Sequence, residues 1–284
     1  MKKFLLIGDW GQEEGESIPF FSSKWINRLH ESDYDELLLL GDNFYPSGVN
    51  DTKDKQWDTK MKRFFPKHKV KNAILGNHDY VGNVQAQLQF TLQSKNFNWN
   101  LPHFFHDNYY EDIKCHIFFI DTQILSPMYT TAMMVACQAS QENLQTMYRL
   151  HDKFEKSQLR WLDSGLENSK AKWKIVVGHY PVVSNGLHEI SIETKEKLMP
   201  ILDKHKVDIY ASGHDHNLQL KKEKNTHYVV TGALSYFTIP PDEESSLFIG
   251  KEPGCFSIEV STFEIKFLVW TESKEYCVYH LIKN

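Results

Sequence analysis

The amino-acid sequence predicts a layered α/β protein with large sheets. Before about residue 213, short apolar runs typical of buried strands alternate with stretches of helical periodicity, which is the order of elements in α/β folds. After residue 225 the helical pattern stops, and apolar runs follow one another closely, as antiparallel hairpins do. No linker, repeat or low-complexity segment divides the 284 residues, so residues 1–284 are predicted to form a single domain.

The predicted strands are the short apolar runs. They lie at about residues 3–8, 36–41, 72–76, 115–121, 173–178, 207–213, 226–231, 255–260, 264–270 and 277–283. Several of these runs are continuous rather than alternating, which is typical of strands that are covered on both faces.

The predicted helices repeat apolar side chains at helical spacing. They cover residues 20–30, 57–65, 84–97, 141–166 and 192–206. Two further stretches show no clean period and are predicted to be long loops, residues 125–140 and residues 237–254. Loops of this length usually have a function or are mobile.

Composition and charge narrow the class of protein. With 41% hydrophobic residues the chain can bury a substantial core, and we expect an ordinary soluble globular protein. We also expect it to be a monomer. The formal net charge is −5 and there is no basic block, which argues against a nucleic-acid-binding surface. No apolar run reaches the roughly 18 residues of a membrane span.

The N-terminal residues leave the compartment open. Lys2 and Lys3 are basic, but only the apolar residues 4–7 follow them, which is too short for the apolar core of a secretory signal. The protein is therefore expected to be cytoplasmic if the chain is complete as written, and secreted or lysosomal if the chain is a mature form.

The four cysteines give no metal motif. No Cys-x-x-Cys occurs, so a thiolate zinc site is not expected. Cys115, Cys255 and Cys277 lie in strand-like runs, where a buried free thiol is the ordinary state. Cys137 lies in the first predicted loop, and its pairing stays open.

Five of the apolar runs end in a glycine that is followed by aspartate, asparagine or histidine. The five clusters are Gly8-Asp9-Trp10-Gly11, Gly41-Asp42-Asn43-Phe44-Tyr45, Gly76-Asn77-His78-Asp79, Gly178-His179 and Gly213-His214-Asp215-His216. Glycine lets the chain turn and lets a ligand approach the backbone closely. Because ligands collect at the carboxyl ends of the strands of such sheets, the clusters are expected to meet in one place.

The side chains in these clusters suit metal ions. Carboxylate, imidazole, amide and phenol groups are ligands for divalent and trivalent transition metals, and an aspartate can bridge two ions with its two oxygens. Two ions about 3.5–4 Å apart can clamp a phosphoryl group and supply hydroxide at modest pH. Seven side chains are available for this: Asp9, Asp42, Tyr45, Asn77, His179, His214 and His216.

The order and spacing of the clusters resemble the five sequence blocks of the metallophosphoesterases. Tyr45, three residues after Asp42, resembles the purple acid phosphatase branch, and residues 178–182 and 213–219 resemble its small, tartrate-resistant form. The resemblance spans roughly residues 3–232. It implies a four-layer αββα sandwich in which helices flank two mixed β-sheets.

The resemblance also implies an activity and a metal content. The implied ligands are Asp9, Tyr45 and His216 for Fe(III), Asn77, His179 and His214 for a second ion, and Asp42 as the bridge between the two. The second ion would be Fe(II), Zn(II) or Mn(II). His78 and His188 would face the substrate phosphate. Such an enzyme is an acid phosphatase that hydrolyses phosphomonoesters, of small molecules or phosphoproteins, by attack of a metal-bound hydroxide.

Other interpretations of these residues stay open. Tyr45 could pack against Phe44 without binding a metal, and His188 could be an exposed loop residue. Asp79 and Asp215 are expected to orient ligands rather than to bind metal. The stretch 125–150 has a sequence of its own in this family, and the pair Met133 and Met134 is expected to pack on the mouth of the site as part of a flexible loop.

Two other functions are compatible with the fold. The first is a non-catalytic anchor or interaction protein, because a fold can be kept after its catalytic activity is lost. The second is a phosphodiesterase that keeps the metal ions.

Overall fold

The computed structural model of the chain describes residues 1–12, 23–93, 95–234, 236–241 and 246–283. Within these residues the strands form two seven-stranded sheets. In spatial order, the first sheet consists of β14 (Glu275–Ile282), β13 (Glu264–Trp270), β12 (Cys255–Val260), β1 (Lys2–Ile7), β2 (Glu36–Leu40), β3 (Val70–Ile74) and β4 (Trp99–Asn100). The second consists of β11 (Ser246–Ile249), β9 (Leu218–Glu223), β10 (Thr226–Thr231), β8 (Ile209–Ser212), β7 (Trp173–Val177), β6 (Cys115–Phe119) and β5 (His106–Tyr110).

Both sheets are mixed. In the first sheet β1 to β4 are parallel, and β12, β13 and β14 pair antiparallel beside them. In the second sheet β6, β7, β8 and β10 are parallel, whereas β5 pairs antiparallel with β6, β9 with β10, and β11 with β9. The carboxyl ends of β1, β2 and β3, and likewise those of β7 and β8, therefore come out at one edge of their sheet.

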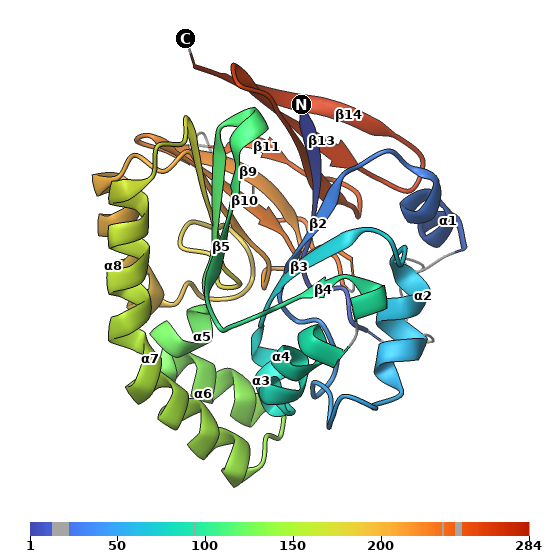
Figure 1. Cartoon of the computed structure of the whole chain (residues 1–284), viewed down its shortest axis with the longest axis vertical. Coiled ribbons are helices and arrows are strands. Elements are labelled where there is room, and N and C mark those ends of the chain that lie inside the picture. Colours follow the sequence, from blue (N-terminus) through green and yellow to red (C-terminus); the bar gives the residue numbers. More distant parts are fainter. Residues whose placement is uncertain (13–22, 94, 235, 242–245, 284) are drawn as a thin grey trace.

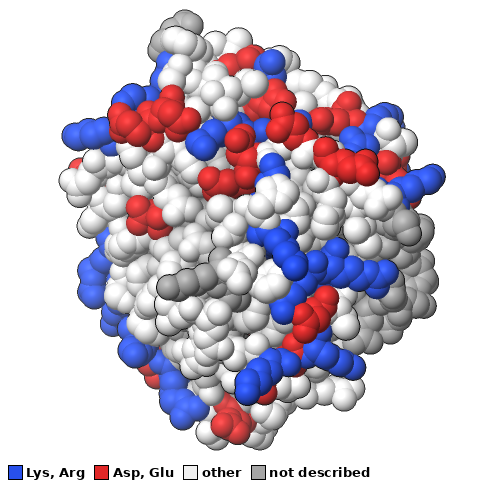
Figure 2. All heavy atoms as spheres, turned by 45° about the vertical axis from the view of Figure 1, so that its right-hand side comes forward, with Lys and Arg blue, Asp and Glu red and all other residues white. Residues whose placement is uncertain are grey.

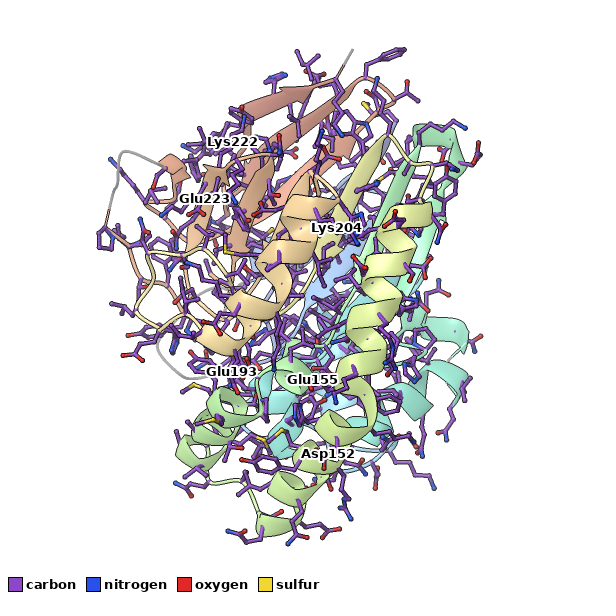
Figure 3. The ribbon with its side chains drawn as sticks, turned by 90° about the vertical axis from the view of Figure 1, so that its left-hand side faces the viewer. Asp152, Glu155, Glu193, Lys204, Lys222 and Glu223 are labelled. Carbon is purple, nitrogen blue, oxygen red and sulfur yellow. The ribbon has the colours of Figure 1, made fainter. Side chains whose placement is uncertain are left out.

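Helices cover the outer faces of the two sheets (Figure 1). They are α1 (Ser23–Glu31), the π-helical turn η2 (Trp57–Met61), α2 (Lys62–Phe64), α3 (Asn77–Val81), α4 (Val84–Gln93), α5 (Thr122–Leu125), α6 (Pro127–Ala136), α7 (Gln141–Asn168) and α8 (Ile192–Lys204). The described residues also contain two short turns, η3 (Lys95–Phe97) and η4 (Glu111–Ile113). Helices α7 and α8 lie side by side, and Lys197 of α8 pairs with Glu155 of α7 at 2.6 Å (Figure 3).

The alternation of side chains along the strands separates the layers. On β1, Leu5 and Ile7 belong to the cluster that also holds Trp57 from the helical side, whereas Phe4 and Leu6 belong to the cluster between the sheets. The same division occurs in the second sheet. Along β7, side chains point in turn into the layer between the two sheets and toward the outer helices α7 and α8. The predicted four-layer αββα class is thereby confirmed.

The predicted loop over residues 125–140 is wrong. Helix α6 occupies most of this stretch and begins at Pro127, whose fixed φ and missing N–H suit the first helical position. Its buried residues, Pro127, Thr130 and Met134, lie on one face, but the exposed side carries the apolar Met128 and Val135, so the sequence has no polar face and no clean period. Met134 is buried in the core, so the predicted flexible methionine loop at the site mouth is also wrong.

Several other boundaries differ from the predictions. Strand β11 lies within the second predicted loop, of which residues 242–245 are outside the described part of the chain, and β4, β5 and β9 were not predicted at all. Residues 20–22 of the first predicted helix also lie outside the described residues. Cys277 is exposed on β14 rather than buried, because β14 is the outermost strand of its sheet, while Cys115 and Cys255 are buried as predicted. All four cysteines are free thiols.

The surface carries both signs of charge. On the face in Figure 2, acidic side chains gather in the upper part, and basic side chains lie beside and below them, so neither sign covers the whole face. Of the helices in the described ranges, none combines the length and the apolar character that crossing a bilayer requires.

Candidate metal centre

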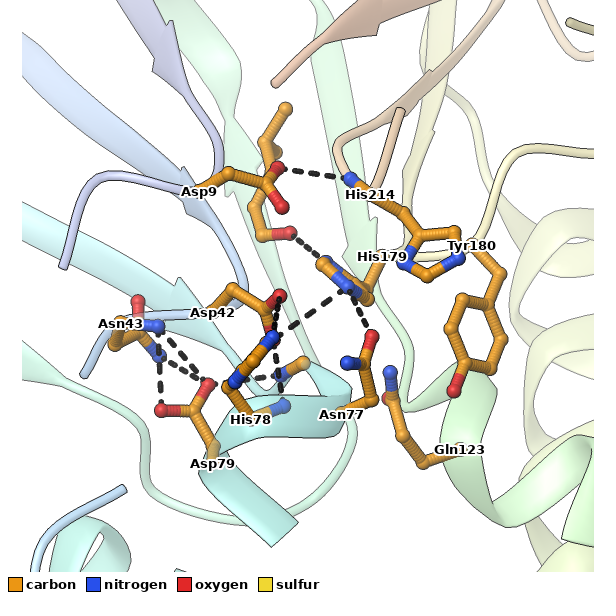
Figure 4. Close-up of polar contacts among 12 residues, drawn as sticks. Asp9, Asp42, Asn43, Asn77, His78, Asp79, Gln123, His179, Tyr180 and His214 are labelled. Atoms are coloured by element: carbon orange, nitrogen blue, oxygen red, sulfur yellow. Dashed lines mark hydrogen bonds and ion pairs between the residues drawn. The ribbon is translucent and has the colours of Figure 1, made fainter. Parts of the chain in front are cut away.

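The five predicted clusters meet where the carboxyl ends of the two sheets approach each other (Figure 4). Asp9 follows β1 and His214 follows β8, and the backbone N–H of His214 donates to Oδ2 of Asp9 at 2.8 Å. This hydrogen bond joins loops from different sheets. The convergence expected from strand ends alone is therefore present in the structure.

Unusual backbone conformations aim several of these side chains into the centre. Asp9, Asp42 and His214 have φ values of 55°, 51° and 67°, which only a small share of non-glycine residues adopt. Such conformations cost on the order of 1 kcal/mol or more each and cluster at functional sites. At Gly41, with φ 88°, an added Cβ would come within 2.7 Å of Nδ1 of His179, so a larger residue would displace that ring.

Asp42 lies between two groups of donor atoms. Its Oδ2 is 2.9 Å from the hydroxyl of Tyr45, which is also 3.1 Å from Oδ1 of Asp9. Nε2 of His216 lies 3.3 Å from the same hydroxyl and 3.5 Å from Oδ1 of Asp9. The first group therefore contains Asp9, Tyr45 and His216 around one oxygen of Asp42.

The second group surrounds the other oxygen of Asp42. Nε2 of His179 is 3.6 Å from Oδ1 of Asp42 and 3.1 Å from Oδ1 of Asn77. Nδ1 of His179 is 2.8 Å from the carbonyl oxygen of Leu40, which can only accept, so in the neutral ring Nε2 carries a lone pair. Three acceptor atoms then converge without a proton between them, an arrangement that a cation would satisfy.

The electrostatics agree with a site for cations. Ligand atoms of Asp9, Asp42 and His179 all lie within 4.8 Å of one another, and the three residues are buried. Burial acts to raise the pKa of Asp42, but His179 and His78 outweigh it and hold that pKa below its usual value. Burial and the neighbouring histidines keep the pKa of His214 well below its usual value, so its ring is neutral and can ligate.

The two predicted substrate-facing histidines flank this centre. Nδ1 of His78 lies 2.6 Å from the carbonyl oxygen of Pro46, and its Nε2 lies 4.0 Å from Oδ2 of Asp42. Burial acts to lower the pKa of His78, but Asp42 and Cys137 raise it to about 10. The ring of His188 is 4.6 Å from the ring of His214 and 5.7 Å from that of His216.

Asp79 and Asp215 support the loops rather than join the donors. Asp79 is buried and accepts hydrogen bonds from the backbone N–H of Gly76 at 2.9 Å and from Gln87 at 2.8 Å, which holds the start of α3. Oδ1 of Asp215 accepts from the backbone N–H of His188 at 3.0 Å. Asp215 thus fixes the loop that carries His188.

Helix α6 contributes contacts that the sequence did not reveal. Its Tyr129 hydroxyl lies 3.0 Å from Nε2 of His214, and Sγ of Cys137, which follows the helix, lies 3.7 Å from Nδ1 of His78. No motif marks either residue. The only signal that could have found Tyr129 is the helix itself, and the irregular pattern of this stretch predicts a loop instead.

A cavity of about 380 Å³ opens beside the first group of donors. Its described lining residues are Gln12, Tyr45, Leu187, His188, Asp215, His216, Tyr236 and Thr238. Leu187 and Tyr236 give it apolar and aromatic walls at the surface, and none of these lining residues is a lysine or arginine.

Two mixed sheets flanked by helices, with oxygen and nitrogen donors gathered at their common carboxyl edge, define a metallophosphoesterase. Residues 2–218 match the family described as calcineurin-like phosphoesterases, and the chain belongs to this family. Its curated relatives include purple acid phosphatases and tartrate-resistant acid phosphatases, which confirms the resemblance seen in the sequence.

Human tartrate-resistant acid phosphatase type 5 is 32% identical over 252 residues, which cover 82% of this chain and 73% of that protein. Purple acid phosphatase 7 of Arabidopsis thaliana is 28% identical over 278 residues, which cover 95% and 82% of the two chains.

Solved structures share the fold at lower identity. GAP50, the anchor in the inner membrane complex of Plasmodium, superposes with a TM-score of 0.77 at 23% identity, over 100% of this chain and 88% of that one. A dimetal phosphatase from Danio rerio has a TM-score of 0.64 at 16% identity, over 98% of each chain. These likenesses concern the fold alone.

Proposed function

We propose that this protein is a binuclear metal-dependent acid phosphatase that hydrolyses phosphomonoesters. The observation that supports this most directly is the position of Asp42, whose two carboxylate oxygens face two separate groups of donors. A site for a single ion would require only one group of donors, at one of the two oxygens. The buried acidic centre would also be costly without cations to compensate its charge.

The donors divide into two ligand sets around the bridge. Asp9, Tyr45 and His216 would hold Fe(III), and Asn77, His179 and His214 would hold a second ion, Fe(II), Zn(II) or Mn(II). A phenolate and a carboxylate are hard anionic donors, which favour the trivalent ion, and neutral imidazole and amide donors suit a divalent one. When bound, two such ions acidify water and neutralise charge on a phosphoryl group.

His78 and His188 would both act on the substrate, His78 from beside Asp42 and His188 from beside His214 and His216. With Nδ1 of His78 held by the Pro46 carbonyl, Nε2 is the atom that faces the donors. A protonated ring there can donate to the phosphate or to the leaving oxygen. His188 would hold the phosphate as a second donor, in an orientation that Asp215 maintains through the backbone.

The cavity beside the centre favours a single phosphate on an apolar body. Its walls include Leu187, Tyr236 and Tyr45, which suit an aryl or apolar group. No lysine or arginine lies among its described lining residues, so the further phosphates of a nucleotide would lack the cationic partners that such groups usually have. This supports a phosphomonoester, free or on a protein, over a polyphosphate.

A non-catalytic anchor is the second candidate, because the likeness to the Plasmodium anchor covers the whole chain. The donor geometry argues against it. Asp9 and Asp42 are buried together in left-handed conformations, an arrangement that costs stability and that anchoring does not require. A phosphodiesterase of the same fold would keep this geometry and differ in the substrates it turns over.

Iron-loaded protein is expected to be purple or pink. A phenolate bound to Fe(III) gives a charge-transfer band in the visible, and only Tyr45 among the proposed ligands can supply it. Tyr45→Phe should remove the band while the carboxylate and imidazole ligands still hold iron. The check is a visible spectrum together with metal content, and a coloured Tyr45→Phe protein would contradict the assignment.

The experiment that tests the proposed function measures metal content and hydrolysis together. Purified protein should contain two metal ions per chain and hydrolyse an aryl phosphate, with a rate that is highest at acid pH. A bis-aryl phosphodiester serves as the competing substrate. Two ions without hydrolysis of either ester would favour the anchor, and preference for the diester would favour the phosphodiesterase.

A further inference from the structure

Tyr129 of α6 touches the candidate metal centre without being one of its donors. Its hydroxyl lies 3.0 Å from Nε2 of His214 and donates a hydrogen bond to the carbonyl oxygen of Glu189 at 2.7 Å. Its ring packs edge-on against the ring of Tyr180, with 4.9 Å between the centroids. The phenol therefore bridges His214 and the loop that carries His188.

The protons at this contact can be assigned from its partners. A tyrosine hydroxyl has one proton, and the carbonyl oxygen of Glu189 can only accept, so the proton of Tyr129 lies on that bond. The phenol oxygen must then accept from the atom on its other side. Nε2 of His214 consequently carries a proton, and in the neutral ring Nδ1 carries the lone pair.

We propose that Tyr129 is a positioning residue that holds His214 in the Nε2-protonated form, so that Nδ1 is the atom offered to the second metal ion. This inference rests on the proposed function. Histidine ligands are commonly oriented by an acceptor on the ring nitrogen away from the metal. His179 uses the opposite nitrogen, because its Nδ1 faces the Leu40 carbonyl and Nε2 faces the donors.

Helix α6 holds Tyr129 rigidly enough for this role. The hydroxyl of the next residue, Thr130, is buried, donates to the carbonyl oxygen of Gln123 at 3.2 Å and contacts the hydroxyl of Tyr180 at 3.2 Å. At the start of the helix, Oγ of Ser126 lies 2.5 Å from Oγ1 of Thr194 on α8. A side chain fixed through its own helix orients a ligand at little entropic cost.

Replacing Tyr129 with phenylalanine tests the proposal, because it removes one oxygen atom and keeps the ring packing. In iron-loaded protein, Tyr129→Phe should weaken the binding of Zn(II) at the second position by about 10–100-fold, as measured by competition with a chelator. The visible band of the iron should not change. The matched control is Tyr148→Phe on α7, whose hydroxyl accepts from Thr131 of α6 at 3.1 Å and touches no donor of the centre.

A second measurement locates the ring proton of His214 directly. In metal-free protein, ¹⁵N–¹H correlation spectra of the histidine rings should show His214 protonated at Nε2, and Tyr129→Phe should convert it to a mixture of tautomers. Thermal unfolding of each variant confirms that the fold is retained. Nδ1 protonation in the parent protein would overturn the proposal, even if a variant failed to fold.

The outcomes separate this inference from the proposed function. If the parent protein takes up a second ion and Tyr129→Phe binds it equally well, the role of Tyr129 is overturned and the proposed function stands. If the parent protein takes up no second ion, the proposed function fails and the role of Tyr129 fails with it. A change in KM with Zn(II) affinity unchanged would make Tyr129 a substrate contact instead, which also overturns the proposal.

Discussion

Asp42→Asn is expected to remove both metal ions and hydrolysis together. The carboxylate faces Tyr45 with one oxygen and His179 with the other, so its loss weakens both ligand sets at once. An amide offers one oxygen and no charge in place of the bridge. Loss of the ions removes several kcal/mol of transition-state stabilisation, equivalent to at least about 10³-fold in kcat/KM. Metal analysis of the purified variant and hydrolysis of an aryl phosphate provide the measurement.

Asparagine is the appropriate replacement because of the backbone. Asp42 has φ 51°, and asparagine adopts this region more readily than alanine or any branched residue. The variant should therefore fold, which its thermal unfolding in the metal-free state can verify. Asp152→Asn is the matched control, since Asp152 is an exposed residue of α7 on the helical face of Figure 3 and makes none of the contacts described for the centre. Asp42→Asn protein that keeps both ions would end the two-ion interpretation.

Much of the fold could be predicted from the sequence because the central strands are buried on both faces. The run Leu37-Leu38-Leu39-Leu40 is fully apolar, and its side chains divide between the helical layer and the layer between the sheets. Strand β5, in contrast, reads His106-Asp107-Asn108-Tyr109-Tyr110 and lies at the edge of its sheet. Its polar residues lack the apolar run by which the central strands were recognised, so pairing with β6 rather than composition defines it.

The candidate site also contains residues that the sequence predicts from local patterns and residues that only long-range contacts reveal. Each predicted donor follows a strand within a few residues, so strand ends alone brought Asp9, Asp42 and His214 together. Tyr129 belongs to a helix that is apolar on most sides, and the residue it touches is 85 positions away. No pattern in a single sequence encodes such a contact. Residues that orient donors from another layer are therefore found only when the layers are assembled.

His78→Ala is expected to keep both metal ions and lose about 10²–10⁴-fold in rate. His78 touches the donors in two separate ways. Its backbone N–H donates to Oδ1 of Asp42 at 2.8 Å, and alanine keeps this bond, so the bridge retains its support. Its ring contacts the Pro46 carbonyl and packs at a tilt of 39° against the ring of Tyr45, with 4.1 Å between the centroids. This ring provides the proton donor, and alanine removes it.

The pH dependence distinguishes an acid from a neutral donor. A general acid must be protonated, so kcat/KM of the parent protein should fall as pH rises through the pKa of His78. In the metal-free protein Asp42 helps to raise that pKa to about 10, and bound cations would lower it by repulsion. His78→Ala should lack this alkaline limb, whereas Cys137→Ala, which removes a neighbour of the ring at 3.7 Å, should keep it. Unchanged turnover in His78→Ala would exclude a direct role. A uniform loss at every pH would mean that the ring contributes equally when it is neutral, so it would be a neutral hydrogen-bond donor rather than an acid.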